Sequence, residues 1–380
     1  MKESPRIAAF TRDLYHCADC NYCVDAVWPE RGLVHVCPTL QSHSPLTSYS
    51  GRGYVAAARA WHEGAALDLP TLGERVFTCT TCGHCETVCP IGLRPTQVAR
   101  ALRGDLWEHA AVPVPARQLR DAMRRDGNPN GVARAARQAW QSALPPPAPS
   151  ATRPVRYLPG CAAATAHPAE ARAAVALMRQ AGYAVATLGD ADSCCGAPLF
   201  ELGLDDEAAA LSDALAAKCV TPGPLVASGL ECARSWARRD ADSRTPEAFV
   251  PWLLARLDNG EFVPDPAREP PPVRLLDSCQ SRDRDDHAQA LRTLLSRLGV
   301  LIVESATSAR HVVCCGAAGG MPRMAPGAAA HMATARLAED GVYVGADARC
   351  VAHLRAHADP AHVQVFGIAE FVHHHFGAPA

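Results

Sequence analysis

Short apolar runs alternate with alanine-rich stretches of helical periodicity from about residue 152 onward. The apolar runs predict β-strands at 155–158, 184–188, 225–228, 273–277, 300–303 and 342–345. The stretches between them predict helices, for example at 169–181, 206–218, 286–298 and 327–337. Strands that alternate with helices of this length form βαβ units, so this half is predicted to be α/β with parallel sheets.

The first 150 residues have a different pattern, with apolar positions at helical spacing and no strand signal. This spacing predicts helices at 94–107, 115–125 and 132–143, and the proline-rich run at 145–150 predicts a stiff linker. The second of these helices carries Arg117, Arg120, Arg124 and Arg125. We interpret this face as solvated, with docking of an acidic partner as the alternative.

Cysteines divide the second half into two similar units. Cys161 recurs 118 residues later as Cys279, and Cys232 recurs at the same offset as Cys350. The Cys-Cys-Gly triplet at 194–196 recurs 120 residues later at 314–316. Landmarks at a nearly constant offset predict a repeat, split at the proline-rich and charged stretch 262–272. We therefore expect an α+β fold overall, in four parts at 1–110, 111–150, 151–262 and 272–380.

Composition narrows the class of protein. The 17 cysteines are grouped, and the N-terminal residues are polar without an apolar signal segment, so we expect metal binding in the cytoplasm rather than a disulfide scaffold. No apolar run is long enough to predict a transmembrane helix. Lys and Arg number 37 against 39 Asp and Glu, which argues against a general nucleic-acid binder.

One cysteine group has the spacing of a cluster-binding loop. Cys79, Cys82, Cys85 and Cys89 form C-x2-C-x2-C-x3-C, and Pro90 follows. This spacing is typical of bacterial ferredoxins, in which the fourth cysteine ligates the other of two [4Fe–4S] clusters. The motif therefore predicts a second group of cysteines.

The second group is Cys17, Cys20 and Cys23, with Cys37 before Pro38 as the remote ligand. Thirteen residues separate Cys23 from Cys37 where the standard motif has three, but only the position of Cys37 in space matters. Paired zinc knuckles are the alternative, although zinc sites usually show separate C-x2-C pairs. We assign one [4Fe–4S] cluster to Cys17, Cys20, Cys23 and Cys89, and the other to Cys79, Cys82, Cys85 and Cys37.

The repeated cysteines are predicted to form two further metal sites. Cys161 and Cys232 follow the strands predicted at 155–158 and 225–228. The carboxyl ends of parallel strands meet at one edge of a sheet. Their repetition argues against the alternative of inert, buried thiols, which we keep for the unrepeated Cys219. The two expected ligand sets are Cys161, Cys194, Cys195 and Cys232, and Cys279, Cys314, Cys315 and Cys350.

Two ferredoxin motifs followed by two such units resemble the double-CCG iron–sulfur proteins. This family includes the iron–sulfur subunit of glycolate oxidase, the C subunit of anaerobic glycerol-3-phosphate dehydrogenase and the D subunit of heterodisulfide reductase. The resemblance is carried by Gly51-Arg52-Gly53, Leu158-Pro159-Gly160-Cys161, Cys194-Cys195-Gly196-Ala197 and Cys314-Cys315-Gly316-Ala317-Ala318-Gly319.

The resemblance implies that the CCG sites hold either iron–sulfur clusters or zinc. In heterodisulfide reductases these sites hold non-cubane [4Fe–4S] clusters that reduce a disulfide, and the motif ends in C-x2-C. Ser235 and His353 stand where that last cysteine would be, with His353 as a candidate substitute ligand. The sequence is therefore more similar to the glycolate oxidase type.

No nucleotide-binding glycine motif opens a helix after a strand, so a hydride-accepting cofactor must belong to a partner. We expect an electron-transfer subunit between an FAD-linked dehydrogenase, of the 2-hydroxy acid or polyol phosphate type, and a quinone or similar membrane acceptor. It would be cytoplasmic, with peripheral contact to the inner face of the membrane. The alternatives are a catalytic disulfide reductase and a scaffold with zinc in both CCG sites.

Overall fold

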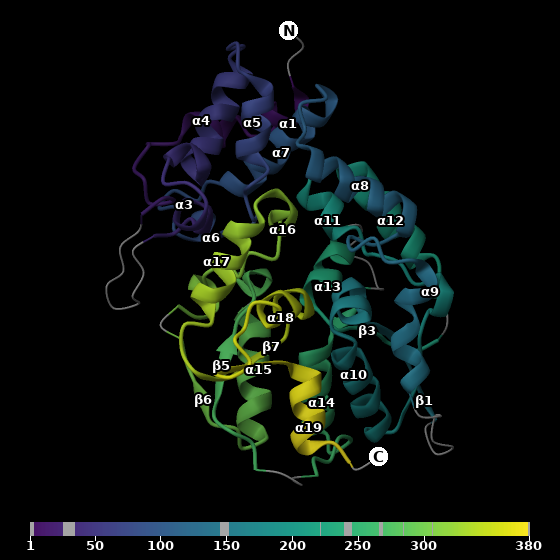
Figure 1. The fold of residues 1–380 in the computed structure, drawn as a ribbon. Coiled ribbons are helices and arrows are strands. Elements are labelled where there is room, and N and C mark those ends of the chain that lie inside the picture. The colour runs from purple at the N-terminus through teal and green to yellow at the C-terminus, as the bar shows by residue number, and fades with distance from the viewer. Residues whose placement is uncertain are drawn as a thin grey trace.

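The structure, a computed structural model, describes residues 4–25, 35–144, 152–220, 222–238, 245–265, 269–283, 285–305 and 307–378. A mostly helical first part lies at one end of the molecule, and two α/β units follow it (Figure 1). The predicted linker at 145–150 and most of the segment between Cys23 and Cys37 lie outside the described residues. Within the described ranges, no helix is long and apolar enough to cross a membrane.

The first part consists of short helices packed around the two cysteine loops. The helix predicted at 94–107 is confirmed as α7, which begins at a proline whose missing N–H leaves no hydrogen bond unmade. Its apolar face packs on α4 in a core that continues into the first α/β unit. The helices are α1 (Pro5–Ala8), α2 (Thr11–Tyr15), α3 (Pro38–Ser42), α4 (Gly51–His62), α5 (Leu69–Val76), α6 (His84–Thr87) and α7 (Pro95–Glu108).

The second predicted helix is confirmed as α8 (Val114–Asp126), but its arginine face is not simply solvated. Arg120 and Arg124 both donate hydrogen bonds to the carboxylate of Glu207, in α12 (Asp205–Ala216) of the first α/β unit. This part of the face is therefore an internal contact that holds α8 against that unit.

The prediction of one continuous helix at 132–143 is wrong. The structure has α9 (Arg134–Arg137) followed by a 3-10 turn, η3 (Ala139–Ala143). The break turns two buried side chains toward the first α/β unit: Arg137 donates to Asp192 at 2.9 Å, and Trp140 packs edge-to-face on Tyr157. Tertiary packing has overridden the local helical preference here.

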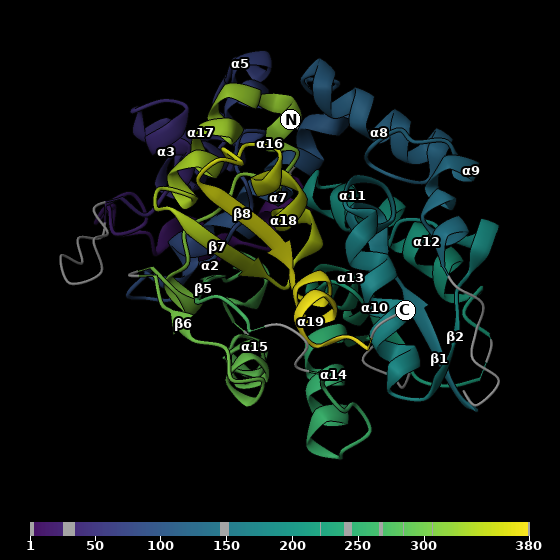
Figure 2. The same cartoon turned by 60° about the horizontal axis from the view of Figure 1, so that its bottom comes forward.

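Each α/β unit contains a parallel four-stranded sheet, and the two sheets have the same strand order. That order is β2-β1-β3-β4 in the first unit and β6-β5-β7-β8 in the second. The strands β5, β6, β7 and β8 of the second sheet are labelled in Figure 2. The six strand pairs in the described residues are all parallel. The fold is α+β overall with two repeated α/β units, as the sequence predicted.

All six predicted strands are present, and two more complete the sheets. One of these is β8, in which Val363 and Val365 are buried and Gln364 is exposed, an alternation typical of a strand. The strands are β1 (Arg153–Leu158), β2 (Tyr183–Ala186), β3 (Leu225–Ala227), β4 (Glu247–Ala248), β5 (Val273–Leu276), β6 (Ile302–Val303), β7 (Gly341–Gly345) and β8 (Val363–Gly367).

The helices of the two units exchange partners. The last helix of each unit packs on the first long helix of the other, so that α14 lies on α15 and α19 on α10 (Figure 2). One continuous core runs through both units as a result. The helices are α10 (Pro168–Gln180), α11 (Ala197–Glu201), α12, α13 (Leu230–Ala237), α14 (Phe249–Asp258), α15 (Asp285–Arg297), α16 (Met321–Met324), α17 (Pro326–Arg336), α18 (Ala348–Arg355) and α19 (Ile368–Phe376).

Candidate metal centres

The repeated cysteines lie at the carboxyl edge of each sheet. Cys161 comes three residues after β1, and Cys279 comes three residues after β5. Cys232 and Cys350 lie in the first turn of α13 and α18, the helices that follow β3 and β7. Strands that neighbour each other in the sheet therefore deliver two cysteines to one edge, as expected for a parallel sheet.

The glycine of each CCG triplet is required by backbone geometry. Gly196 and Gly316 have φ of +85° and +88°, in the left-handed region that side chains disfavour. A Cβ on Gly196 would lie 2.4 Å from the carbonyl oxygen of Ala208, and one on Gly316 would lie 2.9 Å from that of Ala329. The tight turn directs the paired cysteines toward the strand ends before α11 or α16 begins.

The four cysteines of each unit are brought together. In the first unit, the thiols contact one another in the series Cys161, Cys194, Cys195 and Cys232. In the second unit the series is Cys279, Cys314, Cys315 and Cys350, and the last two sulfurs are 3.1 Å apart. Both sets match the residues predicted from the repeat, and Cys219, buried elsewhere in the core, is in neither set.

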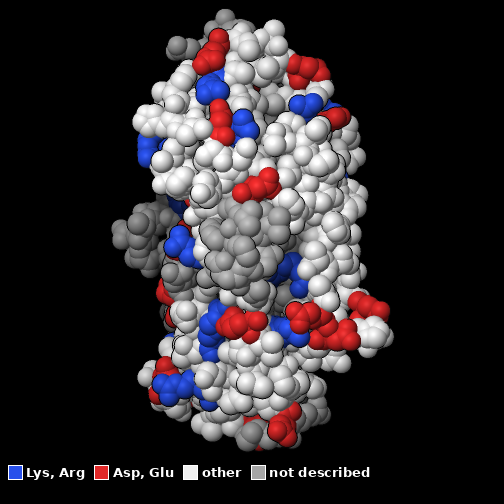
Figure 3. Space-filling view, turned by 90° about the vertical axis from the view of Figure 1, so that its left-hand side faces the viewer, with Lys and Arg blue, Asp and Glu red and all other residues white. Residues whose placement is uncertain are grey.

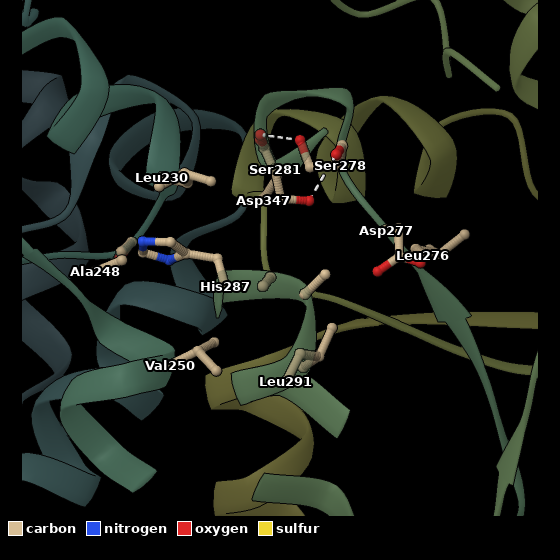
Figure 4. Close-up of a pocket in the computed structure, with 13 residues that line it drawn as sticks. Leu230, Ala248, Val250, Leu276, Asp277, Ser278, Ser281, His287, Leu291 and Asp347 are labelled. Atoms are coloured by element: carbon tan, nitrogen blue, oxygen red, sulfur yellow. Dashed lines mark hydrogen bonds between the residues drawn. The ribbon is translucent and has the colours of Figure 1, made fainter. Parts of the chain in front are cut away.

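A serine–aspartate pair positions two cysteines of the second set. Ser278 donates to Asp347 at 2.8 Å, and the Ser278 oxygen accepts a bond from the Gln280 N–H in the turn that contains Cys279. The other Asp347 oxygen accepts bonds from the first N–H groups of α18, including that of Cys350. These residues border a small cavity of about 30 Å³, into which His287 reaches from α15 (Figure 4).

The residues at the position of the missing fifth cysteine are engaged in other contacts. Ser235 donates a hydrogen bond to the carbonyl oxygen of Cys195 at 2.7 Å. His353 lies 3.1 Å from the carbonyl oxygen of Ala329, and burial lowers the pKa of its imidazole. Both side chains support the backbone near the CCG turns. His353 as a substitute ligand stays a prediction.

The first ferredoxin set lies near the surface. Cys20 is exposed, and Cys17, Cys23 and Cys89 are half-buried. The pKa of the Cys17 thiol is raised by burial and further by the neighbouring thiols of Cys20 and Cys89. Cys89, the fourth cysteine of its own motif, is thus brought to the loop of the other motif.

The second ferredoxin set is buried. Burial, with the neighbouring thiols of Cys79 and Cys82, raises the pKa of Cys37 to about 12, and burial raises that of Cys79 to about 11. Cys85 is buried beside the same thiols. The interleaved assignment thus joins residues that the fold places together, with Cys37 at the loop of the later motif.

Backbone N–H groups donate to three of the cysteine sulfurs, and a side chain braces the first cysteine loop. The amide of Thr81 donates to the Cys79 sulfur at 3.4 Å, that of Leu93 to Cys89 at 3.3 Å, and that of Gly316 to Cys314 at 3.4 Å. Such N–H···S bonds offset the negative charge of cluster thiolates. From the Gly51-Arg52-Gly53 segment, Arg52 donates to Asp19 and Asn21 in the first cysteine loop.

Three arginines, two of them buried and one half-buried, join the parts of the molecule, and no pattern in the sequence indicates them. Arg103 of α7 donates to backbone carbonyls of the ferredoxin loop and of α11. Arg282 donates to the carbonyl of Cys82. Arg349, next to Cys350, forms 2.8 Å ion pairs with Glu201 and with Glu231, the residue next to Cys232. Isolated arginines carry no spacing signal, so only the fold identifies them.

The donor sets fit iron–sulfur clusters. All sixteen predicted ligands are thiols, and a metal deprotonates the thiols that coordinate it. On the face in Figure 3, positive and negative side chains are interspersed, without the broad basic area of a nucleic-acid binder.

Comparison with known proteins agrees with this arrangement. A 4Fe-4S dicluster domain family matches residues 13–93, and a cysteine-rich domain family, CCG, matches residues 155–221 and 273–355. The first CCG match ends before Cys232, which the fold nevertheless brings to its site.

Similar curated proteins are subunits of oxidoreductases. The chain is 26% identical to the D subunit of dihydromethanophenazine:CoB–CoM heterodisulfide reductase of Methanosarcina barkeri, over 79% of this chain and 76% of that protein. It is 27% identical to the D subunit of the Methanosarcina mazei enzyme, over 74% and 71%. It is 26% identical to the glycolate oxidase iron-sulfur subunit of Escherichia coli, over 54% of this chain and 52% of that protein.

Proposed function

Because the chain belongs to the double-CCG iron–sulfur proteins, with a 4Fe-4S dicluster domain before two cysteine-rich domains, we propose that it is an electron-transfer subunit. It takes electrons from an FAD-linked dehydrogenase of a 2-hydroxy acid or a polyol phosphate. It passes them to a quinone or similar acceptor at the membrane, as a cytoplasmic protein that contacts the inner face peripherally.

The observation that carries this proposal is the succession of thiol sets from the surface to the interior. The set of Cys17, Cys20, Cys23 and Cys89 includes an exposed cysteine, whereas Cys37, Cys79, Cys82 and Cys85 are buried. The buried set contacts the CCG cysteines through Cys82 and Cys314. This succession of thiol sets suits a relay in which single electrons enter at the exposed set and leave the protein at another site.

Each set would hold one redox group. The two ferredoxin sets would hold [4Fe–4S] clusters, and each CCG set would hold a further iron–sulfur cluster or zinc. Bound clusters supply one-electron chemistry without proton transfer. The protein's own residues fix the position of the sulfurs, donate N–H groups to some of them and bury the cysteines of the second ferredoxin set.

Metal content and electron transfer test the proposal together. After anaerobic reconstitution with iron and sulfide, two cubanes require about eight irons per chain, and filled CCG sites raise this to about twelve or sixteen. The visible absorbance should bleach when a purified FAD-linked 2-hydroxy acid dehydrogenase and its substrate are added, and return with a short-chain quinone. Colourless protein, or a bleach that quinone does not reverse, would refute the proposal.

Disulfide reduction at a CCG site is the second candidate. It is favoured by a cavity of about 710 Å³ that the half-buried Cys279 lines, which gives a small molecule access to the second CCG set. Ser235 and His353, in place of the fifth cysteines, argue against it. Turnover of a disulfide by the isolated chain with reduced viologen would favour this candidate over the relay.

A further inference from the structure

The two CCG sites are equivalent in topology but have different neighbours. In the second unit, the thiol of Cys314 contacts that of Cys82 from the buried ferredoxin loop. In the first unit, the corresponding cysteine, Cys194, donates its backbone N–H to the carbonyl of Gly127 at the end of α8, at 2.8 Å. The helical segment that covers the first site contains no cysteine.

A single side chain holds the contact at the second site. Arg282 lies three residues after Cys279 and is only 7% exposed. Its Nε donates to the carbonyl oxygen of Cys82 at 3.1 Å, and its two terminal nitrogens donate to the carbonyls of Arg310 and Val312. One guanidinium therefore joins the Cys279 turn, the ferredoxin loop and the segment that leads into Cys314.

Close backbone packing supports the same contact independently. Gly319, in the turn after the second CCG triplet, has φ of +67°, and a Cβ there would lie 2.3 Å from the carbonyl oxygen of Cys79. The same carbonyl accepts a hydrogen bond from the buried Arg103. The ferredoxin loop is therefore fixed against the second unit at Cys79 as well as at Cys82.

We propose that Arg282 is a positioning residue for electron transfer, and that the second CCG site, not the first, exchanges electrons directly with the ferredoxin half. This inference rests on the proposed relay function. One electron leaves the group held by Cys37, Cys79, Cys82 and Cys85, which is oxidised, and reduces the group held by the second CCG set. No covalent bond changes, and no proton moves.

The chemistry of arginine suits this position. Its planar fork can donate from three nitrogens to separate carbonyl oxygens, whereas the three N–H donors of lysine lie on one nitrogen. The cavity of about 710 Å³ borders the junction and is lined by Cys82, Cys279 and Arg282. Loss of the guanidinium would leave buried carbonyls unpaired and allow water between the two thiol sets. Electron transfer slows steeply as the distance between centres grows, so the junction should be sensitive to this change.

The test compares Arg282→Met with a matched control, Arg156→Met. Arg156 also donates to backbone carbonyls, those of Cys219 and Gly223, but lies in β1 away from the ferredoxin loop. Both reconstituted full-length variants are assayed for iron content and circular dichroism. Electron paramagnetic resonance then measures spin coupling between the reduced centres, and freeze-quench sampling measures how fast the second CCG centre is reduced after the cubanes.

Arg282→Met should retain its iron, lose the spin coupling and slow reduction of the second CCG centre by about tenfold or more. Arg156→Met and Cys161→Ser, which removes a predicted ligand of the first site, should leave coupling and rate at the second site unchanged. Arg282→Lys should recover little of the rate.

Unchanged coupling and rate in Arg282→Met would overturn the inference, as would coupling of the cubanes to the first CCG centre alone. A second CCG site that holds zinc or gives no redox signal would overturn it too. If Arg282→Met loses iron, Arg282→Gln, which keeps two of the donors, provides the same comparison. Failure of the proposed relay function would give a different result. The wild-type protein would still show spin coupling between its own centres, but it would exchange no electrons with the dehydrogenase or the quinone.

Discussion

Replacement of Arg103 by methionine should destabilise the whole molecule, because this side chain connects its parts. Arg103 is fully buried in α7. It donates to the carbonyl of Val76 at 2.8 and 3.1 Å, to that of Cys79 at 2.6 Å and to that of Glu201 at 2.7 Å. Methionine preserves much of the length, but it donates no hydrogen bond and loses the guanidinium that lies 5.0 Å from the centroid of the Phe77 ring.

The magnitude follows from the groups left without partners. The buried carbonyl oxygens of Cys79, Glu201 and Gly319 lose the Arg103 donor, whereas that of Val76 still accepts from the Cys79 N–H. Each unpaired acceptor costs about 1–3 kcal/mol. The opposite contribution is desolvation of the guanidinium, since burial lowers the pKa of Arg103 and methionine removes that penalty. We expect a net loss of about 3 kcal/mol in the free energy of unfolding.

Urea unfolding of the anaerobic holoprotein, followed by circular dichroism and visible absorbance, measures this loss. Arg100→Met is the matched control, one turn away on α7, where a part-exposed arginine pairs with the exposed Asp205. This variant should lose less than about 1 kcal/mol. If Arg103→Met stays within about 1 kcal/mol of the wild type, or Arg100→Met loses as much, the reasoning from buried carbonyls is refuted.

Three further predictions follow from the same contacts. Cys37→Ser should lose about four irons, whereas Cys219→Ser should keep its full content, and equal iron in both variants would contradict the assignment of Cys37. Gly319→Ala should lower the free energy of unfolding by about 2 kcal/mol, because Gly319 has a positive φ and a Cβ there would lie 2.3 Å from the Cys79 carbonyl oxygen. Gly327→Ala is the control and should be neutral or stabilising, since its Cβ meets open space. Similar urea midpoints for the two variants would refute this prediction. Burial raises the pKa of Glu207, but hydrogen bonds from Arg120 and Arg124 outweigh this effect and lower the pKa overall. The stabilisation by Glu207 is therefore present above its pKa in the unfolded state and is lost as the pH falls through its pKa in the folded state. Glu207→Gln should therefore cost about 1 kcal/mol at neutral pH and little below about pH 4, and a cost that persists in acid would rule out the ion pair.

Local patterns in the sequence predicted most of the fold. The apolar runs predicted six of the eight strands because each is short, apolar and bounded by turn residues. β8 was missed although its Val363-Gln364-Val365 alternation was visible, and β4 has only two residues, too few for any periodic signal. The prediction of a continuous helix at 132–143 was wrong because the burial of Trp140 against Tyr157 determines the conformation of that segment. That contact depends on the first sheet, which local periodicity does not describe.

The cysteine sets were predictable for a related reason. Ligand spacing within a loop is a local property, and the constant offset of the repeat is visible along the chain. The contact between Cys82 and Cys314 was not predictable, because 231 residues lie between the two cysteines and no periodicity links them. The same holds for Arg103 and Arg282, whose carbonyl partners are backbone atoms that any residue could provide.

The asymmetry between the CCG sites follows from the joining of one ferredoxin-like part to a duplicated unit. Two equivalent sheet edges are available, and the thiol of Cys82 from the buried ferredoxin loop contacts Cys314 at the second. The residues beside the ligands differ accordingly: Ser278 and Asp347 of the second unit correspond, at the offset of 118, to Gly160 and Gly229 of the first. Glycines have no side chain to form such a pair at these two positions, whereas Ser278 and Asp347 form a hydrogen-bonded pair that fixes the cysteine turns of the second unit. A relay needs its sulfurs held in one geometry, and this pair occurs on the side that contacts the ferredoxin loop. The neighbours of the cysteines, rather than the repeated topology, thus distinguish the two sites.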